Sequence, residues 1–299
     1  MFADVCKHLM QSAHRKLKND LDDLLYLIDS SGITLKGQGF DDWTVHSSSG
    51  RIQGLKIHTV YAPETEVPAR IDITPAEISD VEMGKVIPIK KGATYVFDKG
   101  YYDYNWWFEI ENSGAHFVSR FKKNAAIQPI SCMIIHPDER DVILEDSIVE
   151  FSPKSQRNRK GNDYFGTPLR RIVVHREDKS TPLILVSNDF ARSATEIADL
   201  YKRRWAIELF FKWLKQNLKI KKFLGRNENA VKVQIYTALI TYLLLKIRHQ
   251  TQGATCSLKM FMAELRSTLF QKPRIEWEKE RMRRIRAHEF DQRQGCLWA

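Results

Sequence analysis

One predicted helix, spanning 200–219, presents a narrow stripe of side chains suited to binding a phosphate ester. A capping-box pair, Ser193 and Glu196, precedes it, and neither Pro nor Gly interrupts the chain before Gly225. At about 100° per residue, four polar side chains fall within an arc of roughly 60°. These are Tyr201, Arg204, Glu208 and Lys215. Apolar residues cover most of the remaining circle, which predicts one continuous, largely buried helix. The simpler interpretation is the wet face of an ordinary amphipathic helix.

Two further acids, Asp29 and Asp98, each close a predicted buried strand, 24–30 and 93–98. In a mixed sheet with strand order 3-2-1-4-5 these strands are neighbours, so the two carboxylates can meet. A helix packed across that sheet can then add the carboxylate of Glu208. Hard oxygen ligands of this kind suit Mg²⁺ or Mn²⁺, and two such ions activate a hydroxyl nucleophile and stabilise the leaving oxygen at phosphorus.

Other acids compete for the same role. Asp41, Asp42 and Asp103 lie near the two strand ends in the sequence, which by itself does not exclude them. We favour Asp29 and Asp98 because each closes a buried apolar run. The histidines share no metal-ligand spacing, and His58 is interpreted as a packed sheet residue.

The remaining pattern predicts an α/β domain with a mixed five-stranded sheet. The predicted strands are 24–30, 54–62, 69–74, 93–98 and 116–121, and the predicted helices are 3–20, 75–86, 103–113, 200–219, 230–249 and 257–270. The short helix at 75–86 is expected to open at Thr74 and Pro75. Trp106 and Trp107 are interpreted as core residues. From about 124 to 190 the pattern changes to a β insertion with strands at 131–136, 142–151, 170–176 and 183–187. We expect three regions, at 1–20, 21–250 and 251–299.

Charge and cysteine usage narrow the class of protein. The 299 residues carry a formal net charge of +10, which suits a polyanionic partner such as nucleic acid. The four cysteines form no CxxC pair, which favours a reducing compartment and argues against structural zinc. No signal-peptide hydrophobic region opens the chain. The most apolar run, 233–247, is too short and too rich in Thr, Tyr and Gln to span a bilayer, so we interpret it as a buried core helix.

A polar turn at 153–171 inside the β insertion carries six cations against one acid, Asp163. The cations are Lys154, Arg157, Arg159, Lys160, Arg170 and Arg171. This excess predicts contact with the DNA backbone, and the alternative is a solvated surface turn. The tail at 271–293 is also rich in charge, and there the solvated helix face is the preferred interpretation.

Several of these stretches resemble the DDE transposases of bacterial insertion sequences, in the YREK-bearing group that includes the IS-four elements. The matching stretches are LIDSSGITL around Asp29, GLKIHTVYA, VFDKGYYDYNWW around Asp98, HFVSRFKKN, and the stripe Tyr201, Arg204, Glu208 and Lys215. The resemblance covers about residues 20 to 250.

The resemblance implies an RNase H-like fold and metal-dependent cleavage and joining of DNA strands. It implies Asp29, Asp98 and Glu208 as ligands of two Mg²⁺ or Mn²⁺ ions, and Tyr201, Arg204 and Lys215 as contacts to the transposon-end phosphates. It also implies a homodimer assembled on paired ends, in the bacterial cytoplasm, at the nucleoid when bound to DNA. Arg and Lys suit phosphate, because Arg binds it through a fork and Lys through a point charge.

Two departures from the family pattern stand out. Only 28 residues precede Asp29, so the helical domain that recognises the DNA end is expected to be missing. No Trp occurs between Trp107 and Trp205 to stack on a flipped base, so that role is absent or falls to Tyr164 or Phe165. Two other functions therefore stay open beside a transposase catalytic core: a non-catalytic DNA-binding relic, and a stand-alone metal nuclease of the same fold.

Overall fold

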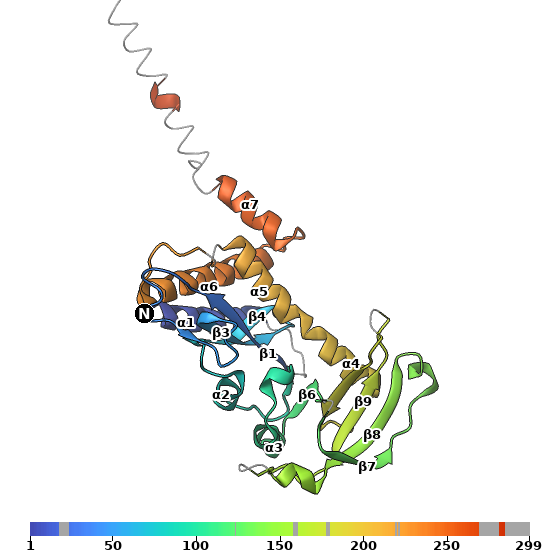
Figure 1. Cartoon of the computed structure of the whole chain (residues 1–299). Helices are drawn as coiled ribbons and strands as arrows, with labels where there is room; N and C mark the ends of the chain where they lie inside the picture. The colour runs from blue at the N-terminus through green and yellow to red at the C-terminus, as the bar shows by residue number, and fades with distance from the viewer. Residues whose placement is uncertain are drawn as a thin grey trace, which may run out of the picture. The chain divides into compact units, whose positions relative to one another are not determined.

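The chain is described by a computed structural model (Figure 1), and the description covers residues 1–17, 24–122, 124–157, 161–177, 180–218, 220, 222–268 and 281–284. Contacts within the chain divide it into two compact units, Met1–Ile247 and Arg248–Ala299. The first unit holds the whole sheet and every candidate site residue that the structure describes.

A ten-stranded mixed sheet forms the centre of the first unit. Its order is β2-β3-β1-β5-β6-β10-β9-β8-β7, and β4 also pairs with β3. The strands are β1 (Leu25–Thr34), β2 (Val45–His46), β3 (Gln53–Ala62), β4 (Val67–Pro75), β5 (Thr94–Phe97), β6 (His116–Arg120), β7 (Ile127–Cys132), β8 (Ile143–Phe151), β9 (Leu169–Val174) and β10 (Leu183–Ser187).

The strand order β4-β3-β1-β5-β6 is the order predicted for the first five strands, but the expected sheet of five strands is too small. The β insertion continues the sheet, because β10 pairs antiparallel with β6, with Leu185 opposite Arg120. Without β10, the outer edge of β6 would expose unpaired backbone N–H and C=O groups, which is a costly arrangement. The insertion therefore extends the sheet rather than standing beside it.

The ends of β1 and β5 bring the two aspartates together. These strands run parallel, with Ile28 opposite Phe97, so Asp29 and Asp98 follow at the next position of each strand. However, β1 does not end near Asp29 as predicted. It continues to Thr34 because residues 30–34 pair with β3, which leaves Asp29 within a strand that has lost its β5 neighbour.

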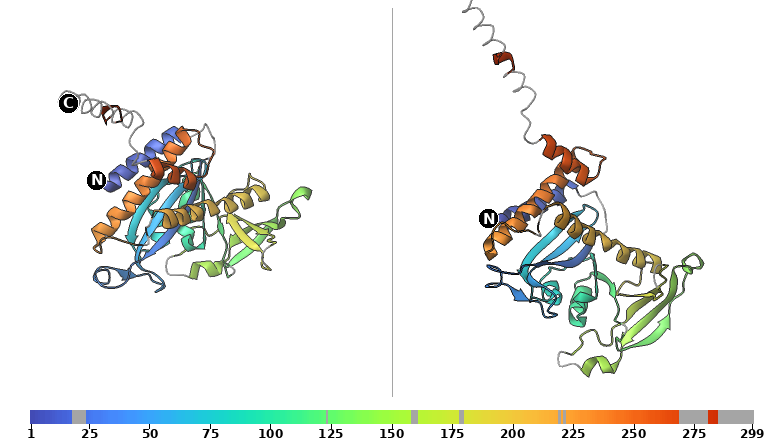
Figure 2. Two further views of the ribbon diagram at one scale, coloured as in Figure 1. Left: turned by 90° about the horizontal axis from the view of Figure 1, so that it is seen from above. Right: turned by 45° about the horizontal axis from the view of Figure 1, so that its top comes forward.

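Helices cover both faces of the sheet (Figures 1 and 2). One face carries α2 (Asp80–Lys85) and α3 (Tyr104–Asn112), and the other carries α1 (Phe2–Leu17), α5 (Trp205–Asn217) and α6 (Glu228–Thr251). The described residues also form α4 (Ala194–Arg203) and α7 (Leu258–Thr268), the latter in the second unit. Under α3 lies an aromatic core in which Trp106 and Trp107 are buried, as predicted.

The short helix begins later than its sequence suggested. Pro75 is the last residue of β4, and α2 starts at Asp80 behind a capping box formed by Ser79 and Glu82. The Ser79 side chain accepts from the Glu82 N–H, and the Glu82 carboxylate accepts from the Ser79 N–H. Because this pair satisfies two free backbone donors, it sets the helix start more effectively than a Pro-led turn does.

Helix α6 is long and apolar enough to cross a membrane by those two criteria alone, and it contains the run predicted to be a core helix. A core helix of a globular protein passes the same test. Here Val231, Ile235, Leu239 and Leu243 are buried in the first unit. On the same face, the Tyr242 hydroxyl donates to the carbonyl of Glu66 at 2.8 Å. This packing supports the core-helix interpretation.

Candidate active site

Asp29 and Glu208 share one cation, the guanidinium of Arg204. Its Nη1 lies 3.5 Å from Asp29 Oδ2, and its Nη2 lies 2.5 Å from Glu208 Oε1. The three side chains are 16% to 32% exposed. Asp29 and Glu208 also line one open hollow of about 400 Å³ with Ser30, Ser31, Phe211, Lys212, Lys215 and Gln216. The structure thus brings together carboxylates that lie 179 positions apart in the numbering of the chain.

A break in the helix places Arg204. Residues 200–219 were predicted to form one helix, but α-helical hydrogen bonding is interrupted at Arg204, whose N–H bonds to the carbonyl of Tyr201, so that the region holds two helices, Ala194–Arg203 and Trp205–Asn217. The helix is also less buried than predicted, since Trp205 is 59% and Leu209 49% exposed. Its buried side, which includes Phe210 and Leu214, packs toward the sheet, so Glu208 faces β1.

Asp98 lies beside this pair, in the turn that follows β5. Its carboxylate caps a short 3-10 helix, Lys99–Tyr101, by accepting from the Gly100 N–H at 2.7 Å. A Cβ on Gly100 would stand 2.8 Å from Asp98 Oδ1, so Gly here keeps the space in front of the carboxylate open. Asp98 is near enough to Asp29 to act on its ionisation.

Burial dominates the electrostatics of Asp29. It raises the pKa of this carboxyl from 3.8 to about 7, against the opposing hydrogen bond from the Ser30 N–H. The negative charges of Asp98 and Glu208 raise the pKa further, and Arg204 lowers it. Burial is therefore the main cause of the raised pKa, and the neighbouring carboxylates add to it.

The donor atoms at this site are of the kind that binds a divalent cation. Carboxylate oxygens are hard ligands, and a bound cation would relieve the charge that raises the pKa of Asp29. In the described part of the chain, however, no three acidic, His or Cys side chains already converge closely enough to form a metal site. Arg204 stands between two of the three predicted carboxylate ligands.

The other members of the predicted stripe also lie at this site. Tyr201 is 8% exposed, and its ring centroid lies 5.6 Å from the Arg204 guanidinium carbon. Lys215 donates from Nζ to the Gly32 carbonyl of β1 at 3.0 Å and lines the same hollow as Asp29 and Glu208. Lys212, one helical turn after Glu208, lines that hollow too. Lys212 was not predicted as a site residue, although its spacing of four residues from Glu208 places it on the same side of the helix.

The basic turn at 153–171 is smaller than predicted. Arg170 is 2% exposed and pairs with Asp146 inside the sheet, and Arg171 pairs with Glu145 at 2.5 Å. Both lie in β9, where they hold β8 and β9 together, so neither is a surface cation for DNA. Lys154 is exposed. Arg159 and Lys160, like the side chain of Arg157, lie outside the described residues.

Lys154 instead belongs to a second basic surface, which we call the lysine hollow. This hollow of about 500 Å³ is lined by Lys85, Lys122 and Lys154, together with residues including Tyr102 and Tyr104. Lys122 lies 4.1 Å from the centroid of the Tyr102 ring. Since Lys122 follows β6, the strand parallel to β5, the hollow lies near the sheet edge that carries Asp98.

Tyr164 is not free to stack on a base. It is fully buried in the aromatic core with Phe117 and Phe151. Its hydroxyl also bonds Glu111. Phe165, the other residue proposed for stacking, is 42% exposed.

Two of the competing acids have structural roles. Asp103 caps α3 through the Trp106 N–H and pairs with Lys85 at 2.8 Å. Asp41 accepts hydrogen bonds from the Gly37 N–H and the Gln53 side chain. A different acid, Asp80, lies at the site and was missed, because its place depends on where α2 starts. As predicted, His58 is packed in the sheet, 5% exposed, with Nε2 2.9 Å from Thr74 Oγ1.

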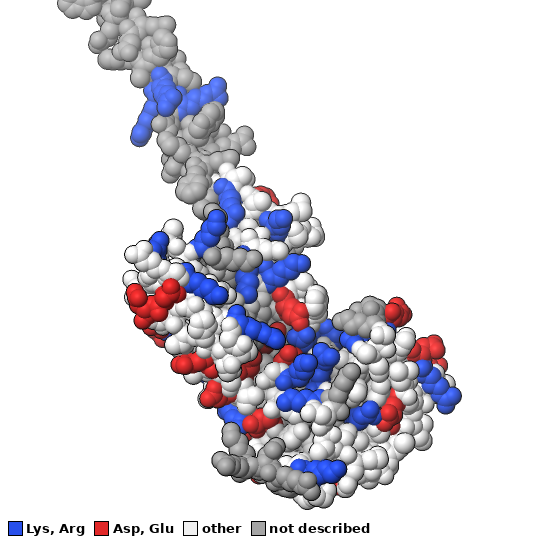
Figure 3. All heavy atoms as spheres, viewed as in Figure 1, with Lys and Arg blue, Asp and Glu red and all other residues white. Residues whose placement is uncertain are grey.

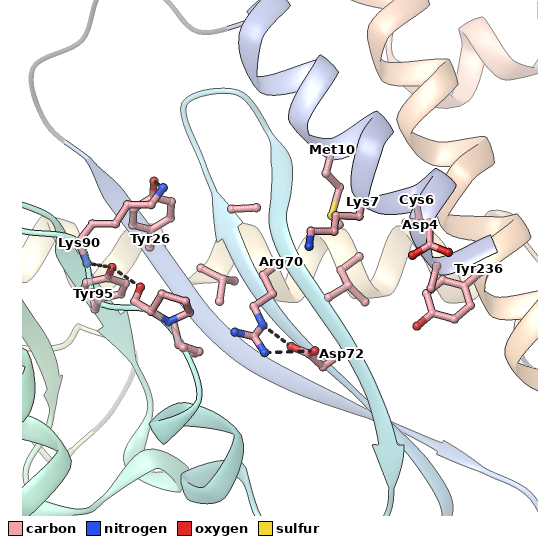
Figure 4. A pocket seen from close by; sticks show the side chains of 16 residues that line it. Asp4, Cys6, Lys7, Met10, Tyr26, Arg70, Asp72, Lys90, Tyr95 and Tyr236 are labelled. Atoms are coloured by element: carbon pink, nitrogen blue, oxygen red, sulfur yellow. Dashed lines mark hydrogen bonds and ion pairs between the residues drawn. The ribbon is translucent and has the colours of Figure 1, made fainter. Parts of the chain in front are cut away.

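The surface around the site is mixed in charge. Figure 3 shows Lys and Arg side chains gathered across the face that carries α4 and α5, with acidic side chains between them. Exposed cations on these helices include Lys202 and Lys212. A further hollow of about 550 Å³ lies between α1 and β4 (Figure 4). Its charged groups are largely paired internally, Arg70 with Asp72 and Lys90 with the Tyr26 hydroxyl.

Comparison with known proteins places the chain in a family. The sequence model of the transposase DDE domain matches residues 20–244, most of the first unit. The chain therefore belongs to the DDE transposases, enzymes that transfer phosphoryl groups on DNA and generally use divalent metal ions. DNA is accordingly its partner.

Relatives agree with this assignment. A protein of Sinorhizobium fredii assigned as the transposase y4zB is 39% identical over 274 residues, which cover 91% of this chain and 74% of that protein. A protein of Geobacillus stearothermophilus assigned as the transposase of insertion sequence element IS5377 is 27% identical over 255 residues, which cover 85% of this chain and 64% of that protein.

Proposed function

We propose that Asp29, Asp98 and Glu208 bind two Mg²⁺ or Mn²⁺ ions and that the chain cleaves and rejoins DNA strands at the ends of an insertion sequence. The contact of one guanidinium with both Asp29 and Glu208 carries this proposal, because it joins a strand acid and a late helix acid at one site. The pKa of Asp29 supports it further, because burial raises it first and the neighbouring carboxylates of Asp98 and Glu208 raise it as well.

Bound ions would activate the attacking hydroxyl and stabilise the leaving oxygen. The chain's own residues would hold the DNA. Arg204 can move its fork from the carboxylates to a phosphate when a cation replaces it, and Lys215 and Lys212 present ammonium groups at the mouth of the same hollow. Tyr201 would orient Arg204 through its ring and donate from its hydroxyl. Arg157, Arg159 and Lys160 stay predicted contacts to the DNA backbone.

The proposed architecture is RNase H-like, of the YREK-bearing IS-four type, acting as a homodimer on paired DNA ends in the bacterial cytoplasm. The support is the central strand order β4-β3-β1-β5-β6 with acids at β1, after β5 and on α5. A stand-alone nuclease of the same fold would share this site, so the products of the reaction must separate the two.

The test is a supercoiled-plasmid assay with Mg²⁺, run beside a labelled duplex that ends in the element's terminal repeat. We expect nicked plasmid and labelled duplex joined to plasmid from the parent chain, and neither from Asp98→Asn. Nicking without joining would indicate a nuclease. No metal-dependent product from the parent would indicate a DNA-binding relic and overturn the proposal.

A further inference from the structure

Asp80, the first residue of α2, reaches the candidate active site from the side opposite Glu208. Its Oδ1 accepts a hydrogen bond from Ser30 Oγ at 2.8 Å, and Ser30 directly follows Asp29. Lys56 on β3 reaches the same oxygen at 3.4 Å and also donates to the Ile78 carbonyl at 2.9 Å. Asp80 thus fixes the point where β1 leaves β5 and continues beside β3 alone.

The second oxygen of Asp80 faces the turn that carries Asp98. Oδ2 lies 3.4 Å from the position that a Cβ on Gly100 would occupy, and Asp98 Oδ1 lies 2.8 Å from that same point. Within the described residues, Oδ2 receives no hydrogen bond. One oxygen of Asp80 is therefore bound to the Asp29 strand, while the other is left free close to the Asp98 carboxylate.

The buried hydroxyl of Tyr101 lies near the same acids. Tyr101 is 1% exposed, and its Oη makes no hydrogen bond of normal geometry within the described residues. The acids that act on this hydroxyl are Asp80, Asp29 and Asp98, in that order. The Ser30 side chain also acts on this hydroxyl, so Tyr101, Ser30 and Asp80 form one polar cluster beside Asp29.

We propose that Asp80 is a positioning residue of the carboxylate site, which holds Asp29 through Ser30 and places its negative charge beside the turn that carries Asp98. This inference rests on the proposed function, because it assigns the cation to Asp29, Asp98 and Glu208. Residues that orient metal ligands from behind commonly change metal affinity by about 10- to 100-fold when they are replaced.

Binding of Mn²⁺ to the full chain, measured by calorimetry in the presence of a terminal-repeat duplex, tests the proposal without relying on activity. Asp80→Asn should weaken Mn²⁺ binding by about tenfold or more, because the amide keeps the size but loses the charge. Ser30→Ala should weaken it by a smaller factor. The matched control is Asp72→Asn, which removes a carboxylate of similar exposure whose partner is Arg70 and not Ser30.

A purely structural role predicts a different result: Asp80→Asn would lower the urea midpoint without metal, yet bind Mn²⁺ within twofold of the parent. That result, or an equal loss in Asp72→Asn, would overturn the proposal. If Asp80→Asn does not fold, Ser30→Ala decides the question, and unchanged affinity there counts against it.

Glu208→Gln separates this inference from the proposed function. If Glu208→Gln weakens Mn²⁺ binding and Asp80→Asn does not, the result supports the proposed metal site and contradicts only the role assigned to Asp80. If Glu208→Gln leaves Mn²⁺ binding unchanged, or the parent binds no Mn²⁺, the proposed function and this inference both fall.

Discussion

Replacing Asp29 with Asn should stabilise the metal-free protein, although it removes a carboxylate that the proposed reaction requires. Asp29 is 20% exposed, and burial raises the pKa of its carboxyl from 3.8 to about 7. Asn keeps the size of the side chain and can still accept from the Ser30 N–H, which bonds Asp29 Oδ1 at 2.8 Å. What the substitution removes is a negative charge near Asp98 and Glu208.

The direction in which the stability changes with pH follows from the raised pKa of Asp29. Below pH 3.8 the carboxyl is protonated in both states and costs nothing. Between pH 3.8 and about 7 the folded state keeps a proton that the unfolded state has released, so stability falls as the pH rises. Above pH 7 the ionised carboxyl lowers the free energy of unfolding by its full amount, about 4 kcal/mol, because each unit of difference between the folded and unfolded pKa corresponds to about 1.4 kcal/mol. The pKa of about 7 already includes the opposing contact with Arg204 at 3.5 Å, and Asn does not reproduce every contact of the protonated carboxyl, so we expect a gain of about 2–4 kcal/mol.

Urea unfolding in EDTA, followed by tryptophan fluorescence, measures this gain. Asp29→Asn should be more stable than the parent at pH 8, and the difference should shrink to about 1 kcal/mol or less near pH 4.5. The control is Asp42→Asn, at an exposed loop acid, which should change stability little at either pH. The reasoning is refuted if Asp29→Asn is no more stable at pH 8, or if its advantage is the same at both values.

Three further predictions concern the DNA surface, the Asp98 turn and the sheet. Glutamine at all three cations of the lysine hollow should lower the slope of log affinity for duplex DNA against log salt by up to about 2, because Asp103 already pairs with Lys85. Glutamine at the exposed residues Lys7, Lys16 and Lys91 should leave the slope unchanged, and equal slopes in the two triple variants would show that the hollow does not contact DNA. Gly100→Ala should displace the Asp98 carboxylate and reduce metal-dependent cleavage about a hundredfold with DNA binding intact, and parent-like cleavage would contradict this. Burial lowers the pKa of His58 from 6.5 to about 4, so this residue should contribute a loss of up to about 3 kcal/mol as the pH falls through that interval, opposite in sign to the contribution of Asp29. In urea unfolding, the stability of His58→Gln relative to the parent should therefore rise as the pH falls from 6.5 to 4, and a constant difference would show that His58 does not titrate in this way.

Much of the central fold could be predicted from hydrophobic patterning. The strand order around Asp29 and Asp98 follows from apolar runs whose lengths and connections allow few topologies. The size of the sheet could not be predicted, because the pairing of β10 with β6 joins Leu185 to Arg120 across the whole insertion. Local periodicity carries no information on such distant pairing.

Part of the site could also be predicted from local patterning. Tyr201, Arg204, Glu208 and Lys215 share a helix, so their spacing alone places them on one side. Asp80 was missed because its place depends on a capping box at Ser79, and Arg170 was misjudged because its partner, Asp146, lies on another strand. Charge counted along a sequence does not distinguish a paired buried cation from a free surface one.

Cleavage by Glu208→Gln tests the central claim most directly. The parent and this variant should bind a terminal-repeat duplex with similar affinity, because the amide keeps the shape of the side chain beside Arg204. With Mg²⁺ or Mn²⁺, the parent should cleave the duplex and the variant should be slower by orders of magnitude. Cleavage by Glu208→Gln at the rate of the parent would contradict the assignment of Asp29, Asp98 and Glu208 to one catalytic site.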